Sequence, residues 1–348
     1  MTRVWDVTVS DSTLVRRARE AAEAAAAASG LDPERAGDAA LVATELATNA
    51  VKYAGGGRLV AEISRDPWGN ARALQILALD HGPGIRDVRR AMTDGFTTGS
   101  SLGTGLGACL RACDYFAVDS VPGQGTLALA RIAPQGAREA FASGAVTGGL
   151  HLPLGGAPES GDGLAFRSAS GHRTVMLADG LGHGPAAAEA SDLAARTVRS
   201  RAGDRPEDLL RFLHSELRSS RGAAVAVADI DESAHRLSFC GVGNIGARLY
   251  SRGGWETLLS RPGIVGAFGL RTPVPLHREW HPGDLLVLCT DGLPSRWSPE
   301  GIERLADLDA ALIAARVFRD AGSAARPLRD DTAVAVVRHT GRLQGVRT

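Results

Sequence analysis

The chain begins with two long runs of good helix formers, at residues 13–29 and 35–54. Each run stops at a glycine, Gly30 or Gly55, and glycine is the residue that most readily ends a helix. After these runs the apolar segments are short, and turns rich in glycine, proline and aspartate separate them. Short segments of this kind are typical of strands. The pattern predicts a mixed fold in which paired helices come first and sheets follow.

The length of 348 residues predicts two domains, because a single hydrophobic core rarely grows beyond about 250–300 residues. We expect a first α/β domain over residues 1–133 and a strand-rich α+β domain over residues 159–340. Residues 134–158 carry glycine, proline and alanine without a sustained period. This composition predicts a linker followed by the entering strand of the second domain.

The balance of charge excludes two classes of partner. Lys and Arg together number 39, as do Asp and Glu, so the net charge is zero. Such a chain lacks the basic surface that binds nucleic acid or an anionic membrane. No apolar run reaches the ~18 residues of a membrane span or resembles a signal peptide, so we expect a cytoplasmic protein. The four cysteines form no CxxC pair, and we expect buried thiols, including Cys109 and Cys113 on one helical face.

Polar residues recur along one face of the second predicted helix. Glu45 and Asn49 are one turn apart, so their side chains project on the same side, and Lys52 follows a turn later. Downstream, a strand ends at Asp80 in the sequence DHGPG, where glycines let the backbone approach a ligand closely. A carboxylate at that point can accept a hydrogen bond from an exocyclic amine.

A second glycine-rich segment, Gly103-Thr104-Gly105-Leu106-Gly107, opens a predicted short helix at 106–113. Free backbone N–H groups at the start of a helix can bind phosphates. Taken singly, each feature has a plainer explanation, because glycines mark turns and polar residues one turn apart can form a solvated helix face. The order and spacing of the features favour a nucleotide site.

The segments ELATNAVKYAGGG, DHGPGI, AMTDGFTTGSSLGTGLG and VPGQGT resemble, in this order, the N-box, the G1-box, the lid with the G2-box and the closing GT of the GHKL ATP-binding fold. In detail they resemble the small serine kinases of bacterial partner-switching modules, across nearly all of residues 1–133. The resemblance implies an N-terminal GHKL (Bergerat) α/β sandwich. The sequence has no histidine-bearing dimerisation helix before it, which disfavours a sensor histidine kinase.

This resemblance implies a role for each matching residue. Glu45 would act as general base on the substrate serine or threonine, and Asn49 would coordinate Mg²⁺. Asp80 would bind the adenine amine with Thr126 near the adenine, and Lys52 would contact phosphate. The residues implied in lining the ATP phosphates are Gly82, Gly84, Gly103, Gly105 and Gly107.

Aspartates stand at the ends of strands in the second half of the chain. Asp162 precedes a strand, Asp179-Gly180 and Asp291-Gly292 end strands, and Asp330-Asp331 begins the last one. Clustered carboxylates repel one another unless a cation neutralises them, which predicts a hard, oxygen-ligated ion such as Mg²⁺ or Mn²⁺. An isolated Asp-Gly or Asp-Asp pair is more often a turn. The metal hypothesis therefore depends on the ordered set.

The segments SGDG, VMLADGLGHGPAAAEAS, GVGNIG, LCTDGL and RDDTAVAVV resemble the PPM-type metal-dependent Ser/Thr phosphatases, over about residues 160–338. The match is to the bacterial branch that includes the sporulation stage II E phosphatase, and it implies a C-terminal α-β-β-α sandwich with two Mg²⁺ or Mn²⁺ ions. Asp331 stands where Asn is common, and the role of His183 stays open. Arg167 and Arg173 are only guesses for the arginine that binds substrate phosphate. The implied metal ligands are Asp162, Asp179, the Gly180 carbonyl, Asp291 and Asp330.

Together the two resemblances imply opposing activities on one pathway, an ATP-dependent serine/threonine kinase and a metal-dependent phosphatase. The expected substrate is a STAS-type antagonist protein of sigma-factor or stress signalling, in phosphorylated and dephosphorylated forms. A sigma factor or another switch partner is a further expected ligand. The alternative is a phosphatase whose first domain binds ATP and sequesters a partner without turnover.

Overall fold

The computed structural model describes residues 3–65, 72–93, 105–157, 159–201, 203–267, 272–294, 297–299, 301–322 and 330–339. The chain divides into two compact units, Thr2–Gly144 and Ala145–Thr348. The predicted linker at 134–158 straddles this division, with a short 3₁₀ helix in the first unit and a strand in the second. Each unit has its own sheet structure and its own hydrophobic core.

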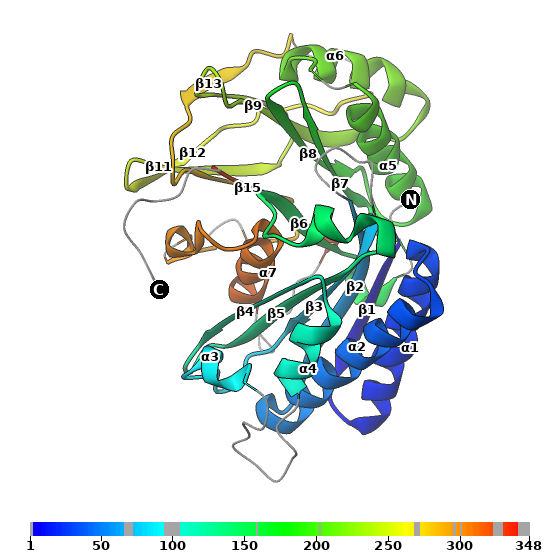
Figure 1. The fold of residues 1–348 in the computed structure, drawn as a ribbon. Coiled ribbons are helices and arrows are strands. Elements are labelled where there is room, and N and C mark those ends of the chain that lie inside the picture. Colours follow the sequence, from blue (N-terminus) through cyan, green and yellow to red (C-terminus); the bar gives the residue numbers. More distant parts are fainter. Residues whose placement is uncertain are drawn as a thin grey trace. The chain divides into compact units, whose positions relative to one another are not determined.

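The first unit is a five-stranded antiparallel sheet with helices packed on one face (Figure 1). The strand order is β1-β2-β3-β5-β4, and β2 and β3 pair as antiparallel neighbours. The elements are β1 (Val4–Val9), α1 (Ser12–Ser29), α2 (Pro33–Ala54), β2 (Gly57–Arg65), β3 (Arg72–Leu79), α3 (Val88–Ala91), α4 (Gly105–Ala112), β4 (Tyr115–Val121), β5 (Gly125–Ile132) and the 3₁₀ helix η1 (Gln135–Phe141).

The two long helices begin and end where the sequence predicts. Asp11 caps α1 and Asp32 caps α2, each by accepting backbone N–H groups of the first turn. Gly30 and Gly55 end the helices in the left-handed conformation, with φ of 77° and 72°. A residue without a Cβ adopts this conformation at little cost. Local sequence therefore fixes both helix boundaries.

Small side chains fill most of the space between the helices and the sheet. Strand residues such as Leu59 and Ala61 of β2 join this core, together with Leu46 of α2 and Cys109 of α4. Alanine leaves room for α1 and α2 to pack closely on each other and on the strands. The buried alanines of the two helices are Ala18, Ala22, Ala25, Ala26, Ala39, Ala40, Ala43, Ala47 and Ala50.

The second unit contains two five-stranded antiparallel sheets, in the orders β13-β10-β9-β8-β7 and β12-β11-β14-β15-β6. The elements are β6 (Thr147–Leu152), η2 (Leu154–Gly156), β7 (Asp162–Ala169), β8 (His172–Gly180), α5 (Pro185–Ser200), α6 (Pro206–Glu216), η3 (Leu217–Ser219), β9 (Ala223–Asp231), β10 (Arg236–Val242), β11 (Gly246–Ser251), β12 (Gly254–Thr257), β13 (Leu276–Glu279), β14 (Leu285–Cys289), η4 (Ile302–Leu305), α7 (Ala310–Ala321) and β15 (Thr332–Arg338).

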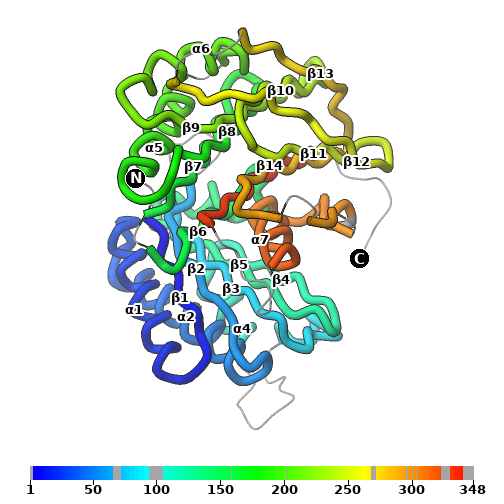
Figure 2. The backbone as a smooth tube through the Cα atoms, turned by 180° about the vertical axis from the view of Figure 1, so that it is seen from behind, coloured from blue at the N-terminus to red at the C-terminus, as the bar shows by residue number. Residues whose placement is uncertain are grey.

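Apolar residues of both sheets meet in one core, which includes Val175 and Leu177 of β8 and Leu286 and Leu288 of β14. A second core joins the first of these sheets to α5 and α6, and α7 packs on β6 and β15 (Figure 2). Helices thus cover the outer face of each sheet. The predicted α-β-β-α sandwich is confirmed.

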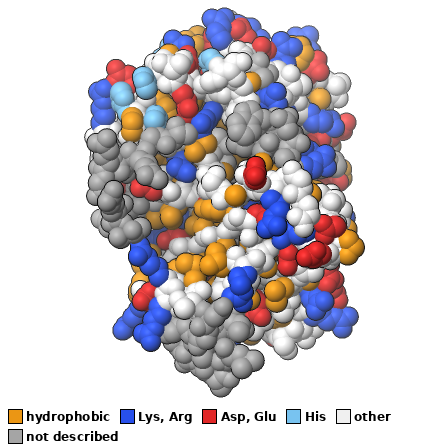
Figure 3. Space-filling view, in the orientation of Figure 1, with side chains coloured by type: hydrophobic (Ala, Val, Ile, Leu, Met, Phe, Trp, Pro, Cys, Tyr) orange, Lys and Arg blue, Asp and Glu red, His pale blue; other side chains and the backbone are white. Residues whose placement is uncertain are grey.

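The surface carries charges of both signs. Figure 3 shows arginine and acidic side chains interspersed over one face, in keeping with the net charge of zero. In the part of the chain that the structure describes, no helix is long and apolar enough to cross a membrane. All four cysteines are free thiols, and Cys113 is only partly buried. Burial raises the pKa of the Cys109 thiol to about 12 and also raises that of Cys113. A thiol with so high a pKa is a poor nucleophile.

Candidate functional sites

The start of α4 lies against the polar face of α2. A methyl group placed on Gly105 would lie 3.1 Å from Glu45 Oε2 and 3.4 Å from Asn49 Nδ2. Glu45 and Asn49 are half-buried, so each keeps some access to solvent. A side chain at Gly105 would crowd the carboxylate and the amide, so the first turn of α4 lies directly beside both groups.

Asp80 is held in place by backbone groups at the end of β3. Its Oδ1 accepts the N–H groups of Gly82, at 2.8 Å, and Thr126, at 3.0 Å. The Asp80 N–H donates in turn to the Thr126 carbonyl at 3.0 Å. The structure thus brings together the predicted adenine contacts Asp80 and Thr126.

Close backbone contacts explain the glycines around Asp80. A Cβ on Gly82 would lie 2.4 Å from the Ala54 Cβ, and one on Gly84 would lie 2.3 Å from the Val121 carbonyl oxygen. Gly125, with φ of +94°, is tighter still, because a Cβ there would lie 2.1 Å from the Asp80 carbonyl oxygen. The sequence interpretation had singled out Thr126 of the closing GT and missed Gly125. Its place directly before that threonine was the available signal.

The remaining residues predicted for the nucleotide site are less constrained. Lys52 is exposed, and its ammonium group lies 5.0 Å from the centre of the Tyr53 ring. Gly107 is buried within α4. Gly103 and Thr104 lie outside the described residues. The structure therefore joins Glu45 and Asn49 to the start of α4, and leaves the Lys52 contact to phosphate as a prediction.

In the second unit, Asp162 and Asp179 are direct partners across β7 and β8. The Thr290 hydroxyl donates to Asp162 Oδ2 at 2.7 Å. Burial, followed by repulsion from Asp179 and other aspartates, raises the pKa of Asp162 well above its ordinary value despite this hydrogen bond. The sheet register therefore forces two of the predicted ligands together.

The other aspartates belong to the same electrostatic cluster. Burial and the neighbouring Asp291 and Asp330 raise the pKa of Asp179 to about 6. Burial and Asp330 also raise the pKa of Asp291, although the Asn244 amide donates to Asp291 Oδ2 at 2.6 Å. A cation bound among these carboxylates would offset both the burial and the repulsion. Asn244 was not predicted, although it lies in the GVGNIG segment.

Asp331 has a structural task that an asparagine could not fully perform. Its Oδ1 accepts the Leu154 N–H at 2.7 Å and its Oδ2 accepts the Gly161 N–H at 2.6 Å. An amide offers only one such acceptor oxygen. Asp331 therefore holds the segment before Asp162, while its own N–H donates to Asp330 Oδ1 at 2.8 Å.

Two glycines allow chain segments to meet beside this cluster. A Cβ on Gly180 would lie 2.2 Å from the Ala187 carbonyl oxygen of α5, and one on Gly292 would lie 2.0 Å from the Asp331 carbonyl oxygen. Gly180 N–H also donates to the Gly161 carbonyl at 3.0 Å. Gly292 was not singled out as a site residue, although the Asp-Gly pair was the signal.

The donor set suits a hard divalent cation. Carboxylate and carbonyl oxygens are the ligands that Mg²⁺ and Mn²⁺ prefer, and an ion would neutralise the repulsion within the cluster. Over the described ranges, no three His, Cys, Asp or Glu side chains already converge into a metal-binding group. Since these carboxylates repel one another, an ion would have to draw them together.

An arginine that the sequence interpretation missed lies next to the loop after Gly180. Arg221 Nη1 would lie 3.1 Å from a Cβ on Gly182, and the Arg221 side chain is exposed. The Gly182 carbonyl in turn borders Gly161. Arg173, one of the two guesses, instead pairs with Glu232 at 3.2 Å, near the end of β8 opposite Asp179. No motif marks Arg221 in the sequence.

Comparison with protein families agrees with this division. Residues 8–131 match the histidine kinase-like ATPase domain, and residues 169–340 match the stage II sporulation protein E (SpoIIE) family. The first unit therefore has the fold of a GHKL-like ATPase domain, and the second has the fold of a PPM-type phosphatase and matches the SpoIIE family over most of its length.

Individual relatives fall into the same two groups. The chain is 40% identical over 83 residues to serine/threonine-protein kinase RsbT of Bacillus subtilis (strain 168), which covers 24% of this chain and 61% of RsbT. It is 25% identical over 134 residues to phosphoserine phosphatase RsbX of the same organism, covering 38% of this chain and 67% of RsbX. A structure from "The bacterial stressosome: a modular system that has been adapted to control secondary messenger signaling" has 28% identity, a TM-score of 0.50, and covers 55% of this chain and 98% of its own.

Proposed function

We propose that this protein is a bifunctional regulator, with an ATP-dependent serine/threonine kinase in its first unit and a Mg²⁺- or Mn²⁺-dependent serine/threonine phosphatase in its second. The observation that carries the kinase proposal is the contact of Gly105 with Glu45 and Asn49. A carboxylate and an amide thus lie beside the start of α4, and a helix start of this kind would bind the phosphates of ATP.

In the kinase reaction, Glu45 would accept the proton of the substrate hydroxyl, because a carboxylate within hydrogen-bond reach serves as general base. Asn49 would bind the Mg²⁺ ion that accompanies ATP. Asp80 keeps its geometry through the N–H groups of Gly82 and Thr126, and would accept a hydrogen bond from the adenine amine. Most of the rate enhancement would come from residues of α2, α4 and β3 holding ATP and the substrate hydroxyl in position.

In the phosphatase reaction, Asp162, Asp179, Asp291, Asp330 and the Gly180 carbonyl would hold two ions. When bound, such ions supply Lewis-acid activation of water and neutralise phosphoryl charge. Thr290 and Asn244 orient two of the aspartates through hydrogen bonds.

Arg221 would bind the phosphoryl group of the substrate. It is a cation at the loop that follows the Gly180 ligand, and a guanidinium pairs well with phosphate oxygens. This assignment adds a substrate contact that the motifs leave open.

The proposed substrate is a STAS-domain antagonist protein, phosphorylated by the first unit and dephosphorylated by the second. Similarity to a protein named a serine/threonine kinase and to one named a phosphoserine phosphatase supports the pairing of activities. Similarity to a stressosome structure supports a partner-switching context. A sigma factor or another switch partner would then receive the output.

The test measures transfer of labelled phosphate from ATP to a candidate STAS protein at fixed Mg²⁺ and Mn²⁺. Wild type, Glu45→Ala and Asp291→Asn are compared. We expect labelling by wild type, none by Glu45→Ala, and accumulation of label with Asp291→Asn because removal of phosphate stops.

The alternative is that the first unit binds ATP without turnover and sequesters a partner. Under that alternative no target is labelled, Glu45→Ala leaves signalling intact, and Mn²⁺-dependent dephosphorylation persists. That combination of results would remove the kinase from the proposal while leaving the phosphatase.

A further inference from the structure

We propose that Arg35 is a positioning residue for the phosphates of ATP, acting through α4. The inference rests on the proposed ATP-binding function and concerns a residue in none of the nucleotide motifs. Arg35 stands at the first turn of α2, well before Glu45 on the same helix.

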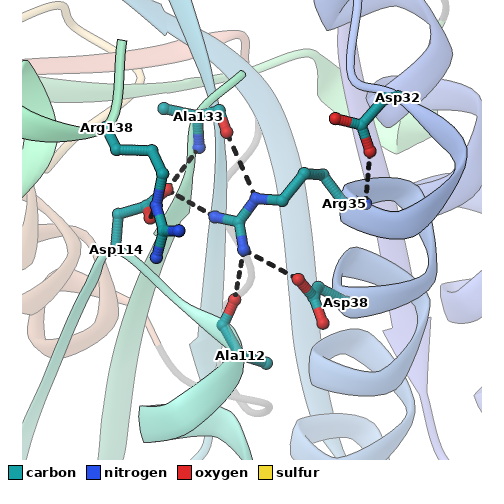
Figure 4. Close-up of polar contacts among 7 residues, drawn as sticks. All are labelled: Asp32, Arg35, Asp38, Ala112, Asp114, Ala133 and Arg138. Carbon is teal, nitrogen blue, oxygen red and sulfur yellow. Dashed lines mark hydrogen bonds and ion pairs between the residues drawn. The ribbon is translucent and has the colours of Figure 1, made fainter. Parts of the chain in front are cut away.

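The Arg35 guanidinium is buried, with 6% of its side chain exposed, and every nitrogen has a partner (Figure 4). Nη2 binds Asp114 Oδ2 at 2.5 Å, and Nη1 binds Asp38 Oδ2 at 2.7 Å and the Ala112 carbonyl at 3.1 Å. Nε donates to the Ala133 carbonyl at 3.3 Å. One side chain thus joins α2, the end of α4 and the end of β5.

The Ala112 carbonyl matters because it belongs to the last residue of α4. Carbonyls at the end of a helix have no partner within the helix, so Arg35 satisfies one from outside. A helix of eight residues has little stability of its own and depends on its tertiary contacts. Arg35 therefore fixes the end of α4 opposite to the phosphate-binding start.

Both ends of α4 contact α2. The start at Gly105 lies against Glu45 and Asn49, and the end at Ala112 is held by Arg35. Eight residues span about 12 Å, and the stretch of α2 from Arg35 to Glu45 spans about 15 Å. Because α4 depends on its tertiary contacts, loss of the Arg35 hydrogen bond at its end would shift its start as well, and with it the N–H groups proposed to face phosphate.

Asp114 completes the arrangement. Its carboxylate accepts the N–H of Ala133 at 2.7 Å and pairs with Arg138 at 2.6 Å as well as with Arg35. Arg138 approaches from solvent, with 49% of its side chain exposed. Arg138 donates to Asp114 and not to a residue of α4, which makes it the matched control for loss of an arginine at Asp114.

The contacts proposed for adenine do not involve Arg35 or Asp114. Asp80 and Thr126 are fixed to each other by two hydrogen bonds, one from the Thr126 N–H to Asp80 Oδ1 and one from the Asp80 N–H to the Thr126 carbonyl. Displacement of α4 should therefore weaken binding of phosphates and spare binding of the base. A general loss of stability would weaken both.

The experiment measures dissociation constants for MgATP by calorimetry and for adenosine by ligand-observed NMR. The variants are Arg35→Met, Arg35→Lys, Asp114→Asn and the control Arg138→Ala, with melting temperatures recorded for each. We expect at least a tenfold loss of MgATP affinity in the Arg35 variants, a change below twofold for adenosine, and near wild-type binding in Arg138→Ala. Lysine is expected to fail because it lacks the planar fork of donors.

Arg35→Lys keeps the positive charge, so its MgATP and adenosine affinities test the inference even if Arg35→Met does not fold. Equal losses for MgATP and adenosine, or unchanged MgATP binding in Arg35→Lys, would overturn the inference. Absence of MgATP binding in the wild type would instead overturn the proposed function, so the two failures are distinguishable.

Discussion

Glu62 provides a pH-dependent test of the first unit. It lies in β2 with 7% of its surface exposed, and it accepts a hydrogen bond from Gln75 Nε2 at 2.7 Å on the neighbouring strand. Gln75 accepts in turn from Arg131 Nε at 2.9 Å. Burial raises the pKa of Glu62 from 4.5 to about 7, and the Gln75 hydrogen bond and the Arg131 charge only partly oppose it.

The raised pKa of Glu62 sets the sign and the size of the pH dependence of the free energy of unfolding. Below pH 4.5 the carboxyl is protonated in both the folded and the unfolded chain, and its burial costs no ionisation energy. As the pH rises toward about 7, the unfolded chain ionises first, so the folded state loses stability. At about 1.4 kcal/mol per pH unit between the two pKa values, the loss amounts to about 3 kcal/mol above pH 7.

Glu62→Gln keeps the shape of the side chain and removes its titration. We expect the variant to match wild type near pH 4 and to exceed its free energy of unfolding by about 3 kcal/mol near pH 8. Urea denaturation at a series of pH values measures this difference. Glu20→Gln is the control, because Glu20 is an exposed partner of Arg16 on α1 and should give no pH-dependent difference.

The pKa itself can be read from carboxyl ¹³C shifts of glutamate-labelled protein, in which the signal missing from Glu62→Gln identifies the residue. A titration midpoint below about 5 would refute the reasoning from burial. A stability difference that stays constant with pH would do the same.

Three further outcomes test the remaining sites. Gly125→Ala should lower the free energy of unfolding by at least about 2 kcal/mol, because its φ is +94° and a Cβ would lie 2.1 Å from a carbonyl oxygen. Gly123→Ala is the control, since Gly123 has φ of +81° but open space around it, and it should lower the free energy of unfolding by less. Thermal melts of both variants measure the difference. Thr290→Val removes the hydroxyl that orients a clustered aspartate, and should weaken Mn²⁺ binding by about 10–100-fold while ATP binding is unchanged. Arg221→Ala should raise KM for a phosphorylated STAS protein by about tenfold with little change in kcat, and an unchanged KM would argue against that phosphate contact.

Much of the first unit could be predicted because its signals are local. Helix propensity together with Gly30 and Gly55 placed α1 and α2, and short apolar segments separated by turn residues indicated strands such as β2 and β3. The spacing of Glu45 and Asn49 on one helix fixed their common face before any fold was known. Motif order then indicated the nucleotide and metal sites.

Other features depend on segments that are distant in the sequence. The pairing of Asp162 with Asp179 follows from the β7–β8 register, and the position of Gly105 against Glu45 follows from the packing of α4 on α2. Arg221 and Arg35 belong to no motif.

The sequence alone indicated the main helices, the presence of strands and the order of the motifs, because propensity, helix-ending glycines and turn residues act over a few residues. Only the tertiary structure decided which oxygens are already committed to backbone N–H groups, as in Asp331, and which carboxylates repel each other, as in Asp179 and Asp291. Burial, register and the distance between charges are set by the whole packed chain, and these quantities control pKa and ligand binding.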